Sequence, residues 1–392
     1  MMNRNQLNLD FVPELIDDFA EIADYDCKER GYQINTPEYI NLENSTQAIG
    51  FFSGAGGLDI GSVLAGIPVI SCLDFDGDSV KTLRKNKVFA RSEHHCQDIS
   101  SVTAEDYTKT IKDNNPSKLI LLGGPPCQPF SKAGYWIGNQ NRQANDDPRN
   151  MIYQYLRLIE DLKPDGFLLE NVESILHPTN VIAVENLTEA IDKLGYRLKM
   201  VRSNAIDYGV PQRRKRVFFI ASRKPFMTNS PVKTHGSEEE CLYNPKLYPH
   251  ERVVDWLHPY KSDEFFEREE LANHGTYYED LVAVPPGKNY IALTAHAGYP
   301  NPKFIAQKRF WSFLLKLHPL ETSWTIAAQP GPWVGPFHWS SRRLRVPEIA
   351  ALQTFPNDYK FVGSRRSVQK QIGNAVPPLL GKAMIDFLSQ NS

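Results

Sequence analysis

Apolar and polar positions alternate in blocks along the chain from about Ala48 onward. Short apolar runs bounded by turn residues are typical of buried strands, and these runs occupy residues 48–52, 68–75, 118–124, 165–172 and 216–222. The segments between them have the periodicity of amphipathic helices, at 57–66, 78–87, 149–162 and 181–194. Strand and helix in alternation predict an α/β fold with a mostly parallel sheet covered on both faces.

The pattern changes on either side of this region. Residues 1–47 carry an acidic excess, and their apolar positions predict a short amphipathic helix within 11–22. From 223 to about 336, prolines, aromatics and turn residues replace the alternation and predict an irregular second domain. Helical periodicity resumes at 346–355 and 377–388. We therefore divide the chain into an N-terminal extension, a sheet domain, an irregular domain and a C-terminal return to the sheet domain, at 1–47, 48–222, 223–340 and 341–392.

Composition narrows the class of protein without naming a function. The chain has 392 residues, 41% hydrophobic and 23% charged, as ordinary globular proteins do. Its five cysteines form no C-x-x-C pair, which argues against a disulfide framework and a structural zinc site, so we expect no metal. No apolar run is long enough to span a bilayer and no signal peptide is evident, so we expect a cytoplasmic protein without membrane association.

The net charge of −2 would not draw the whole molecule onto nucleic acid, so any site for a polyanion must be local. Three basic clusters, at 212–216, 341–345 and 363–367, are candidates. Each taken alone is more often a solvated face than a phosphate contact.

A glycine-rich loop follows the first predicted strand, in the stretch FFSGAGGLDIG. A dinucleotide motif starting at Gly54 would need glycine where Asp59 stands, and the Gly-Lys of a phosphate loop is absent. Asp74 and Phe75 end the second strand, and Asp98 lies where a third strand would end. Acids at successive strand ends can accept hydrogen bonds from ribose and adenine, although each alone is more often a turn residue or helix cap. Together they favour an adenosine-bearing cofactor without pyrophosphate, and S-adenosylmethionine is the leading candidate.

A thiol stands at the end of the next apolar run, in LILLGGPPCQPFSKAG. A free cysteine is most often an inert buried side chain. Pro125 and Pro126 nevertheless make a stiff loop in front of Cys127, as suits a nucleophile that must be aimed. The thiolate is the reactive form of such a side chain, so nearby positive charge would activate it.

The two following strands carry charged residues near their ends. Glu170 comes directly after apolar residues, where a carboxylate is suited to hold or donate a proton. Asn171 could donate a hydrogen bond to the proline loop. Arg214 and Arg216 alternate along an incipient strand and are predicted to share one face, where they would neutralise developing negative charge.

Six motifs, in this order, make the chain resemble the C5-cytosine DNA methyltransferase family over about 48–388. They are FFSGAGGLDIG, GGPPCQPFS, ENV, QRRKR, RRLRVPEIAALQTFP and QIGNAVPP. The resemblance implies a Rossmann-like, class I S-adenosylmethionine-dependent sheet as catalytic domain, and a target-recognition domain at 223–340. It implies duplex DNA with a specific target sequence as substrate. We expect a monomer in a restriction–modification system, with any cognate endonuclease acting independently.

The resemblance also assigns roles to individual residues. The catalytic set is Cys127, Glu170, Arg214 and Arg216, with Cys127 attacking C6 of a flipped cytosine, Glu170 at N3 and Arg216 at O2. Support of the catalytic loop falls to Pro126, Gln128, Ser131 and Asn171. The cofactor residues are Phe52, Gly54, Gly56, Asp74, Phe75, Asp98, Asn374 and Val376.

The chain departs from the family pattern in two ways, and three rival functions share some of its features. Asp74 replaces a commoner glutamate, and the N-terminal extension has no counterpart in compact members.

An amino-group methyltransferase acting on adenine N6 or cytosine N4 needs no thiol and carries an aromatic after Pro-Pro. A C5 methyltransferase acting on transfer RNA shares most motifs. A catalytically silent DNA-binding protein would not need Cys127, Glu170 and Arg216 together.

Overall fold

The computed structural model describes residues 34, 45–126, 151–306 and 310–392. The helix predicted within 11–22 and the residues Cys127, Gln128 and Ser131 lie outside these ranges. The described chain forms two compact units. One comprises Ile34–His250, Trp324–Pro330 and Gln353–Ser392, and is called the sheet unit. The other comprises Glu251–Ser323 and Gly331–Leu352, and is called the irregular unit.

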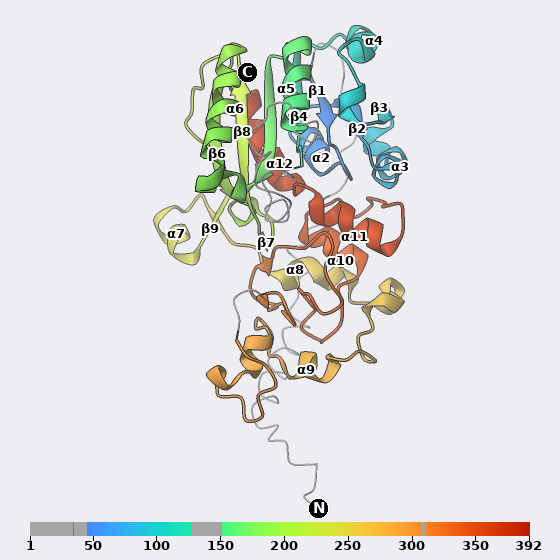
Figure 1. Cartoon of the computed structure of the whole chain (residues 1–392), viewed down its shortest axis with the longest axis vertical. Helices are drawn as coiled ribbons and strands as arrows, with labels where there is room; N and C mark the ends of the chain where they lie inside the picture. The colour runs from blue at the N-terminus through green and yellow to red at the C-terminus, as the bar shows by residue number, and fades with distance from the viewer. Residues whose placement is uncertain (1–33, 35–44, 127–150, 307–309) are drawn as a thin grey trace, which may run out of the picture. The chain divides into compact units, whose positions relative to one another are not determined.

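A seven-stranded sheet in the order β3-β2-β1-β4-β5-β8-β6 forms the centre of the sheet unit (Figure 1). Its strands are β1 (Thr46–Phe51), β2 (Val69–Asp74), β3 (Glu93–Cys96), β4 (Lys118–Gly123), β5 (Gly166–Val172), β6 (Arg197–Asn204) and β8 (Lys215–Ser222). Strands β1 to β5 are parallel to one another, while β8 runs antiparallel to β5 and β6. The predicted α/β class with a mostly parallel sheet is confirmed. Strand β6 has no apolar run that would predict it, because it is an edge strand with two exposed arginines, Arg197 and Arg202.

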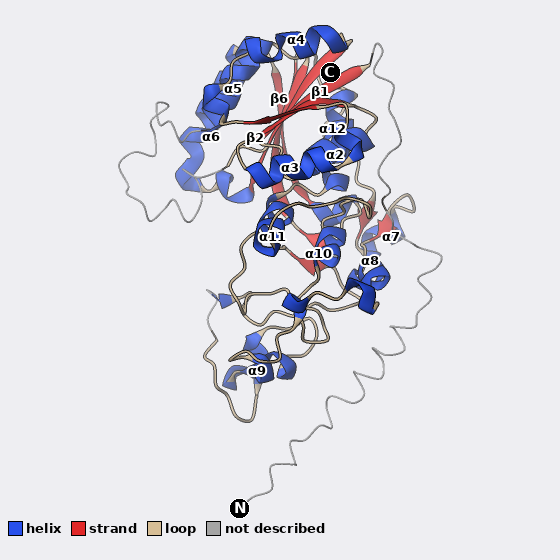
Figure 2. Ribbon diagram, turned by 90° about the vertical axis from the view of Figure 1, so that its right-hand side faces the viewer, coloured by secondary structure: helices blue, strands red, loops and turns tan. Residues whose placement is uncertain are grey.

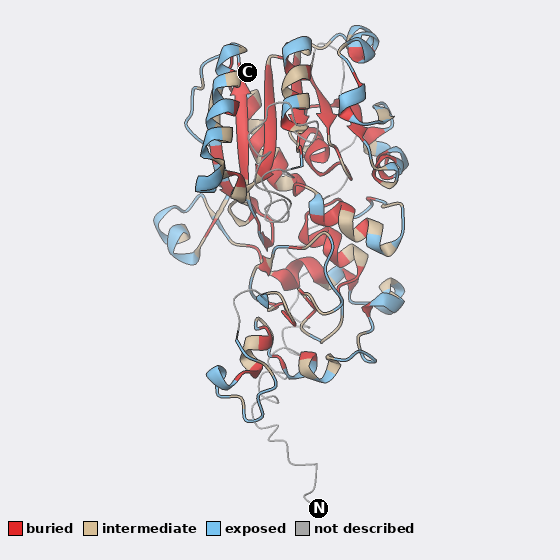
Figure 3. Cartoon of the chain, viewed as in Figure 1, coloured by how far each residue is buried: buried red, intermediate tan, exposed pale blue. Residues whose placement is uncertain are grey.

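Helices cover both faces of the sheet (Figure 2). One face carries α4 (Glu105–Asn114), α5 (Met151–Leu162) and α6 (Val181–Lys193), and the other carries α2 (Gly57–Leu64), α3 (Gly77–Lys85) and α12 (Pro378–Ser389). The central strands are buried while the outer faces of the helices are exposed (Figure 3). Burial on two faces explains why these strands read as unbroken apolar runs.

The C-terminal helix α12 packs closely against α2, the first helix after β1. A Cβ added at Gly61 would lie 2.8 Å from the carbonyl carbon of Gly381, so both glycines allow the helix backbones to approach. Helix α11 (Arg365–Asn374) precedes α12, and its C-terminal end leads directly into the turn before α12. The turn before α12 lies beside the segment that follows β1, since a Cβ added at Gly57 would lie 2.3 Å from Val376 O.

The remaining elements are short. The sheet unit also contains β7 (Gln212–Arg213), α7 (Glu238–Tyr243) and a parallel pair made of β9 (His235–Gly236) and β10 (Tyr248–Pro249). The irregular unit contains α8 (Val253–Leu257), α9 (Tyr278–Ala283) and α10 (Val346–Leu352), and β11 (Ser323–Trp324) falls at a sequence boundary between the units. A second core, which includes Leu281, Tyr290, Leu314 and Phe337, fills the irregular unit. Among the described residues after 223, the elements before α11 are short and no strand joins the seven-stranded sheet.

Candidate active site

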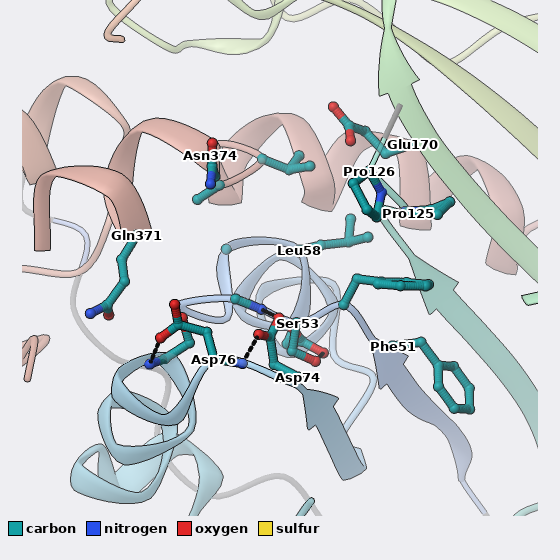
Figure 4. Close-up of a pocket in the computed structure, with 18 of the residues that line it drawn as sticks. Phe51, Ser53, Leu58, Asp74, Asp76, Pro125, Pro126, Glu170, Gln371 and Asn374 are labelled. Atoms are coloured by element: carbon teal, nitrogen blue, oxygen red, sulfur yellow. Dashed lines mark hydrogen bonds between the residues drawn. The ribbon is translucent and has the colours of Figure 1, made fainter. Parts of the chain in front are cut away.

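A cavity of about 430 Å³ opens within the sheet unit, where β1, β2, β4 and β5 end (Figure 4). Pockets that hold small molecules typically measure about 300–1,000 Å³. Open parallel sheets bind ligands at the carboxyl ends of their strands. The lining comes from four stretches far apart in sequence, within residues 51–59, 74–79, 122–126 and 370–376, joined by Glu170, Asn171, Val172 and Arg216. Size and position both mark this cavity as the candidate active site.

The loop after β1 turns back sharply over the strand ends. Phe52, Gly54 and Gly56 have φ values of 55°, 53° and 81°, in the left-handed region. Glycine adopts this conformation freely, but a bulky aromatic residue does so only under strain. Such strain often occurs at functional sites. The turn carries the Gly54 N–H to Asp74 Oδ2, at 2.7 Å.

Two carboxylates mark the end of β2, and Figure 4 shows both facing the cavity. Asp74 is buried, and its Oδ1 accepts a hydrogen bond from the Asp76 N–H at 2.8 Å. Burial raises the pKa of Asp74. Each carboxylate oxygen can accept more than one hydrogen bond, so Asp74 retains capacity for a ligand hydroxyl.

Asp76 is partly exposed and lies 3.0 Å from Lys370 Nζ on α11. Its burial opposes ionisation, but Lys370 and the backbone N–H groups of Asp78 and Ser79 outweigh that effect, so the pKa of Asp76 is lowered. A charged pair therefore links α11 to the end of β2 at the wall of the cavity.

A third carboxylate, Asp59, lines the cavity from α2 and is 1% exposed. Burial raises its pKa to about 7. Its Oδ1 accepts a hydrogen bond from Ser53 Oγ at 3.3 Å. A Cβ added at Gly50 would lie only 1.8 Å from that oxygen, so glycine at position 50 makes room for the acid.

The charges of the described lining favour a cationic ligand over a phosphate group. Its two cationic side chains are both paired, Lys370 with Asp76 and Arg216 with Glu170. No lining cation within the described ranges is left to neutralise a phosphate. Asp74 keeps acceptor capacity, and Asp59 adds negative charge above neutral pH.

The other end of the cavity holds a buried ion pair beside the proline loop. Glu170 Oε1 lies 2.6 Å from Arg216 Nε, and the two side chains are 12% and 13% exposed. Asn171 Nδ2 donates a hydrogen bond to Pro125 O at 3.3 Å. Figure 4 shows Glu170 beside Pro126, away from Asp74 and Asp76. Pro126 is the last described residue before the stretch that contains Cys127.

Comparison with known proteins identifies the family. Residues 46–390 match the family model described as C-5 cytosine-specific DNA methylase. The chain belongs to this methylase family. The family resemblance read from the motifs is thereby confirmed, and the protein is a DNA (cytosine-5-)-methyltransferase.

Individual relatives agree with the family assignment. The chain is 34% identical over 385 residues to the Type II methyltransferase M.SacI of Streptomyces achromogenes, covering 89% of this chain and 94% of the relative. It is 30% identical to the Type II methyltransferase M1.HphI of Haemophilus parahaemolyticus, covering 89% and 88%. The crystal structure of the S. pombe Dnmt2 methyltransferase has the same fold, with a TM-score of 0.56, 17% identity and coverage of 88% and 98%.

Most predicted site residues that can be placed in the methylase line one cavity. They are Phe52, Gly54, Asp74, Phe75, Pro126, Glu170, Asn171, Arg216, Asn374 and Val376. Phe75 is 70% exposed, so most of its side chain is open to solvent. No helix among the described residues could cross a membrane.

Three predicted site residues lie outside the lining of the cavity. Gly56 packs instead against Leu83 and Phe89, where a Cβ would come within 2.9 Å of both side chains. Asp98 Oδ1 accepts hydrogen bonds from Ser100 N and Oγ, at 2.8 and 2.6 Å, and caps a short 3₁₀ helix. The position of Asp98 thus corresponds to the helix-cap alternative.

The prediction that Arg214 shares a face with Arg216 and reaches the site is wrong. Arg214 falls between β7 and β8, where the strand is interrupted, and is 1% exposed. Its guanidinium donates to the backbone carbonyls of Gly373, Asn374 and Ala375. The interruption turns Arg214 into the protein interior and leaves Arg216 facing the cavity.

Several lining residues of the methylase belong to none of the predicted site sets. Asp76 could have been found, because it follows Asp74 by two positions in the same turn. Asp59 was noted only for breaking a dinucleotide motif. Lys370 gave no local signal, since its partner Asp76 lies 294 residues away in the sequence.

Proposed function

We propose that this methylase transfers a methyl group from S-adenosylmethionine to C5 of a cytosine flipped out of a specific duplex sequence, through a covalent bond between Cys127 and C6. The single observation that carries this proposal is the continuous cavity in which the acids at the end of β2 and the Glu170–Arg216 pair share one lining. A methyl donor and a base could therefore occupy the cavity side by side.

The residues of the cavity fit this cofactor. Asp74 can accept hydrogen bonds from ribose hydroxyls, and Phe75 offers a ring against which adenine can stack. Asn374 and Val376 complete the wall. Both lining cations are paired, so a positively charged sulfonium compound is favoured over a pyrophosphate. When bound, the sulfonium supplies an activated methyl group.

The chain's own residues would activate the base. A cytosine ring cannot be reached within the duplex, so it must be flipped into the cavity. The Cys127 thiolate attacks C6 and forms the S–C6 bond, while Glu170 holds a proton at N3 and Arg216 contacts O2. Those contacts stabilise the negative charge displaced into the ring. The resulting enamine makes C5 nucleophilic enough to take the methyl group, and loss of the C5 proton then breaks the S–C6 bond by β-elimination.

We further propose that the enzyme protects DNA in a restriction–modification system, acting as a monomer beside an independent endonuclease. The Type II names of its relatives support this role. The region 223–340 would act as the target-recognition domain. Its loops are suited to reading base edges in the major groove.

The covalent mechanism predicts that Cys127 alone traps a modified substrate. Bisulfite sequencing of plasmid from cells that express the protein first identifies the methylated sequence. A duplex carrying 5-fluorocytosine at that position then blocks loss of the C5 substituent, so the wild type should form an adduct stable in denaturing gels. Cys127→Ala should form none. An equal yield of adduct with Cys127→Ala would overturn the nucleophile assignment, and methylation of adenine or of cytosine N4 would overturn the reaction.

A further inference from the structure

Arg214 is a charged side chain sealed inside the sheet unit, behind the wall of the cavity. It is 1% exposed and is among the largest fully buried side chains of the described chain. Its Nη2 donates hydrogen bonds to Gly373 O at 2.9 Å, Asn374 O at 3.4 Å and Ala375 O at 3.0 Å. These residues form the C-terminal end of α11 and its cap.

The end of a helix needs such a donor. The last carbonyls of an α-helix have no partner within the helix, and a cation there interacts favourably with the helix dipole. A buried guanidinium likewise needs hydrogen bonds to offset its desolvation. Arg214 Nη2 therefore satisfies carbonyls at the end of α11 that lie about 160 residues away in the sequence.

A second side chain of the same segment acts on the same helix end through a relay. Gln212 Nε2 donates to Gln353 Oε1 at 3.0 Å, and Gln353 Nε2 donates to Ile372 O at 2.6 Å. Both contacts are buried. Residues 212–214 thus hold the C-terminal turn of α11 at successive carbonyls.

The held turn is itself a wall of the cavity. Gly373, Asn374, Ala375 and Val376 all line it, whereas Arg214 does not. The wall has little room to shift, because a Cβ added at Gly57 would lie 2.3 Å from Val376 O. A Cβ added at Gly373 would lie 2.5 Å from the Ala328 Cα. A small displacement of the turn would therefore change the shape of the cofactor end.

We propose that Arg214 is a positioning residue that fixes the α11 wall of the cofactor pocket, so that its loss weakens cofactor binding more than it slows the chemical step. The inference rests on the proposed use of S-adenosylmethionine. Two arginines of one short segment, Arg214 and Arg216, therefore have different roles. Arg216 faces the reacting base, while Arg214 shapes the pocket for the methyl donor from behind.

The test is a comparison of cofactor binding with turnover in the full-length protein. Calorimetric titration with S-adenosylmethionine, without DNA, should give a Kd raised about 10- to 100-fold in Arg214→Gln. The KM for the cofactor should rise in parallel, with kcat at saturating cofactor within about threefold of the wild type. Arg214→Lys keeps a donor and should recover part of the affinity. Lys215→Gln, an exposed neighbour, should match the wild type.

Arg216→Gln serves as the opposite control and should lower kcat while leaving the cofactor Kd unchanged. The inference is overturned if Arg214→Gln binds the cofactor like the wild type, or if it loses kcat instead. If Arg214→Gln does not fold, the same measurements are made on Arg214→Lys. A wild-type Kd and KM for the cofactor in that variant, together with a reduced kcat, would overturn the inference. A wild type that binds no S-adenosylmethionine but still forms the fluorocytosine adduct would refute the cofactor assignment itself, and this inference with it.

Discussion

The two units of the methylase use buried charge in different ways. In the described sheet unit, the buried charged residues are Asp59, Asp74, Glu170 and Arg214, and each lines the cavity or holds its wall. In the irregular unit, buried charges serve the fold instead. Arg345 pairs with Glu270, and its guanidinium also donates to the carbonyls of Tyr260 and Ser262 at 2.6 and 2.7 Å.

The difference follows from how each unit satisfies its backbone. Strands and helices pair most of their own N–H and C=O groups. Among the buried charged residues of the described sheet unit, Arg214 alone is seen to donate to backbone carbonyls, at the end of α11. A unit made of short helices and loops leaves buried carbonyls that need donors, and arginine can supply several at once. Arg342 extends the network by pairing with Glu348 at 2.6 Å. Buried charged residues therefore lie at the candidate active site in the sheet unit, whereas in the irregular unit they stabilise the fold.

The largest effect on activity should come from the sheet unit. Glu170→Gln keeps the shape of the side chain but removes the carboxylate that faces Arg216, so kcat should fall about 10²- to 10⁴-fold. Single-turnover methyl transfer to the bisulfite-mapped duplex measures the effect. Glu173→Gln, an exposed change a few residues along, is the matched control. A Glu170→Gln variant within threefold of the wild type would remove Glu170 from the proposed chemistry.

In the irregular unit, loss of a buried charge should lower stability. Arg345→Met removes the nearer of the two arginines that pair with buried Glu270 and leaves only Arg342, at 3.6 Å. It should lower the unfolding free energy of this unit by about 3–5 kcal/mol. Tryptophan fluorescence during urea unfolding reports mainly on this unit, because it contains four of the six tryptophans, Trp256, Trp311, Trp333 and Trp339. Arg268→Met removes an exposed arginine of the same unit and should change little. An equally small loss in both variants would contradict the scaffold role.

The smallest effect concerns pH and Asp59. The native carboxyl holds its proton up to a pH of about 7, whereas the unfolded chain releases it near its ordinary pKa of 3.8. Stability of the native state is therefore lost as pH rises through this window and is constant above it. Asp59→Asn removes that loss, so its unfolding free energy relative to the wild type should rise by about 2–4 kcal/mol between about pH 4 and 7. Urea unfolding at several pH values measures the difference.

Asp113→Asn is the control for the pH experiment, because Asp113 is exposed on α4. An equal rise in Asp113→Asn would show that the effect is not specific to Asp59. If Asp59→Asn shows no rise, then Asp59 ionises normally in the folded protein.

The elements of the sheet and the family of the enzyme follow from the amino-acid sequence alone. Five strands can be recognised as apolar runs in the sequence, because burial on two faces requires apolar residues at neighbouring positions. They are β1, β2, β4, β5 and β8. The ends of those strands can be predicted for the same reason. The sequence therefore places Asp74 and Glu170 correctly at the carboxyl edge of the sheet.

What individual charges do depends instead on the tertiary structure. The family resemblance gives Asp98 and Arg214 roles in the site, yet Asp98 caps a short helix and Arg214 donates to carbonyls at the end of α11. Lys370 and Asp76 form an ion pair across 294 residues of sequence. Periodicity records the environment of neighbouring positions, whereas a contact between distant residues depends on packing that no local pattern encodes.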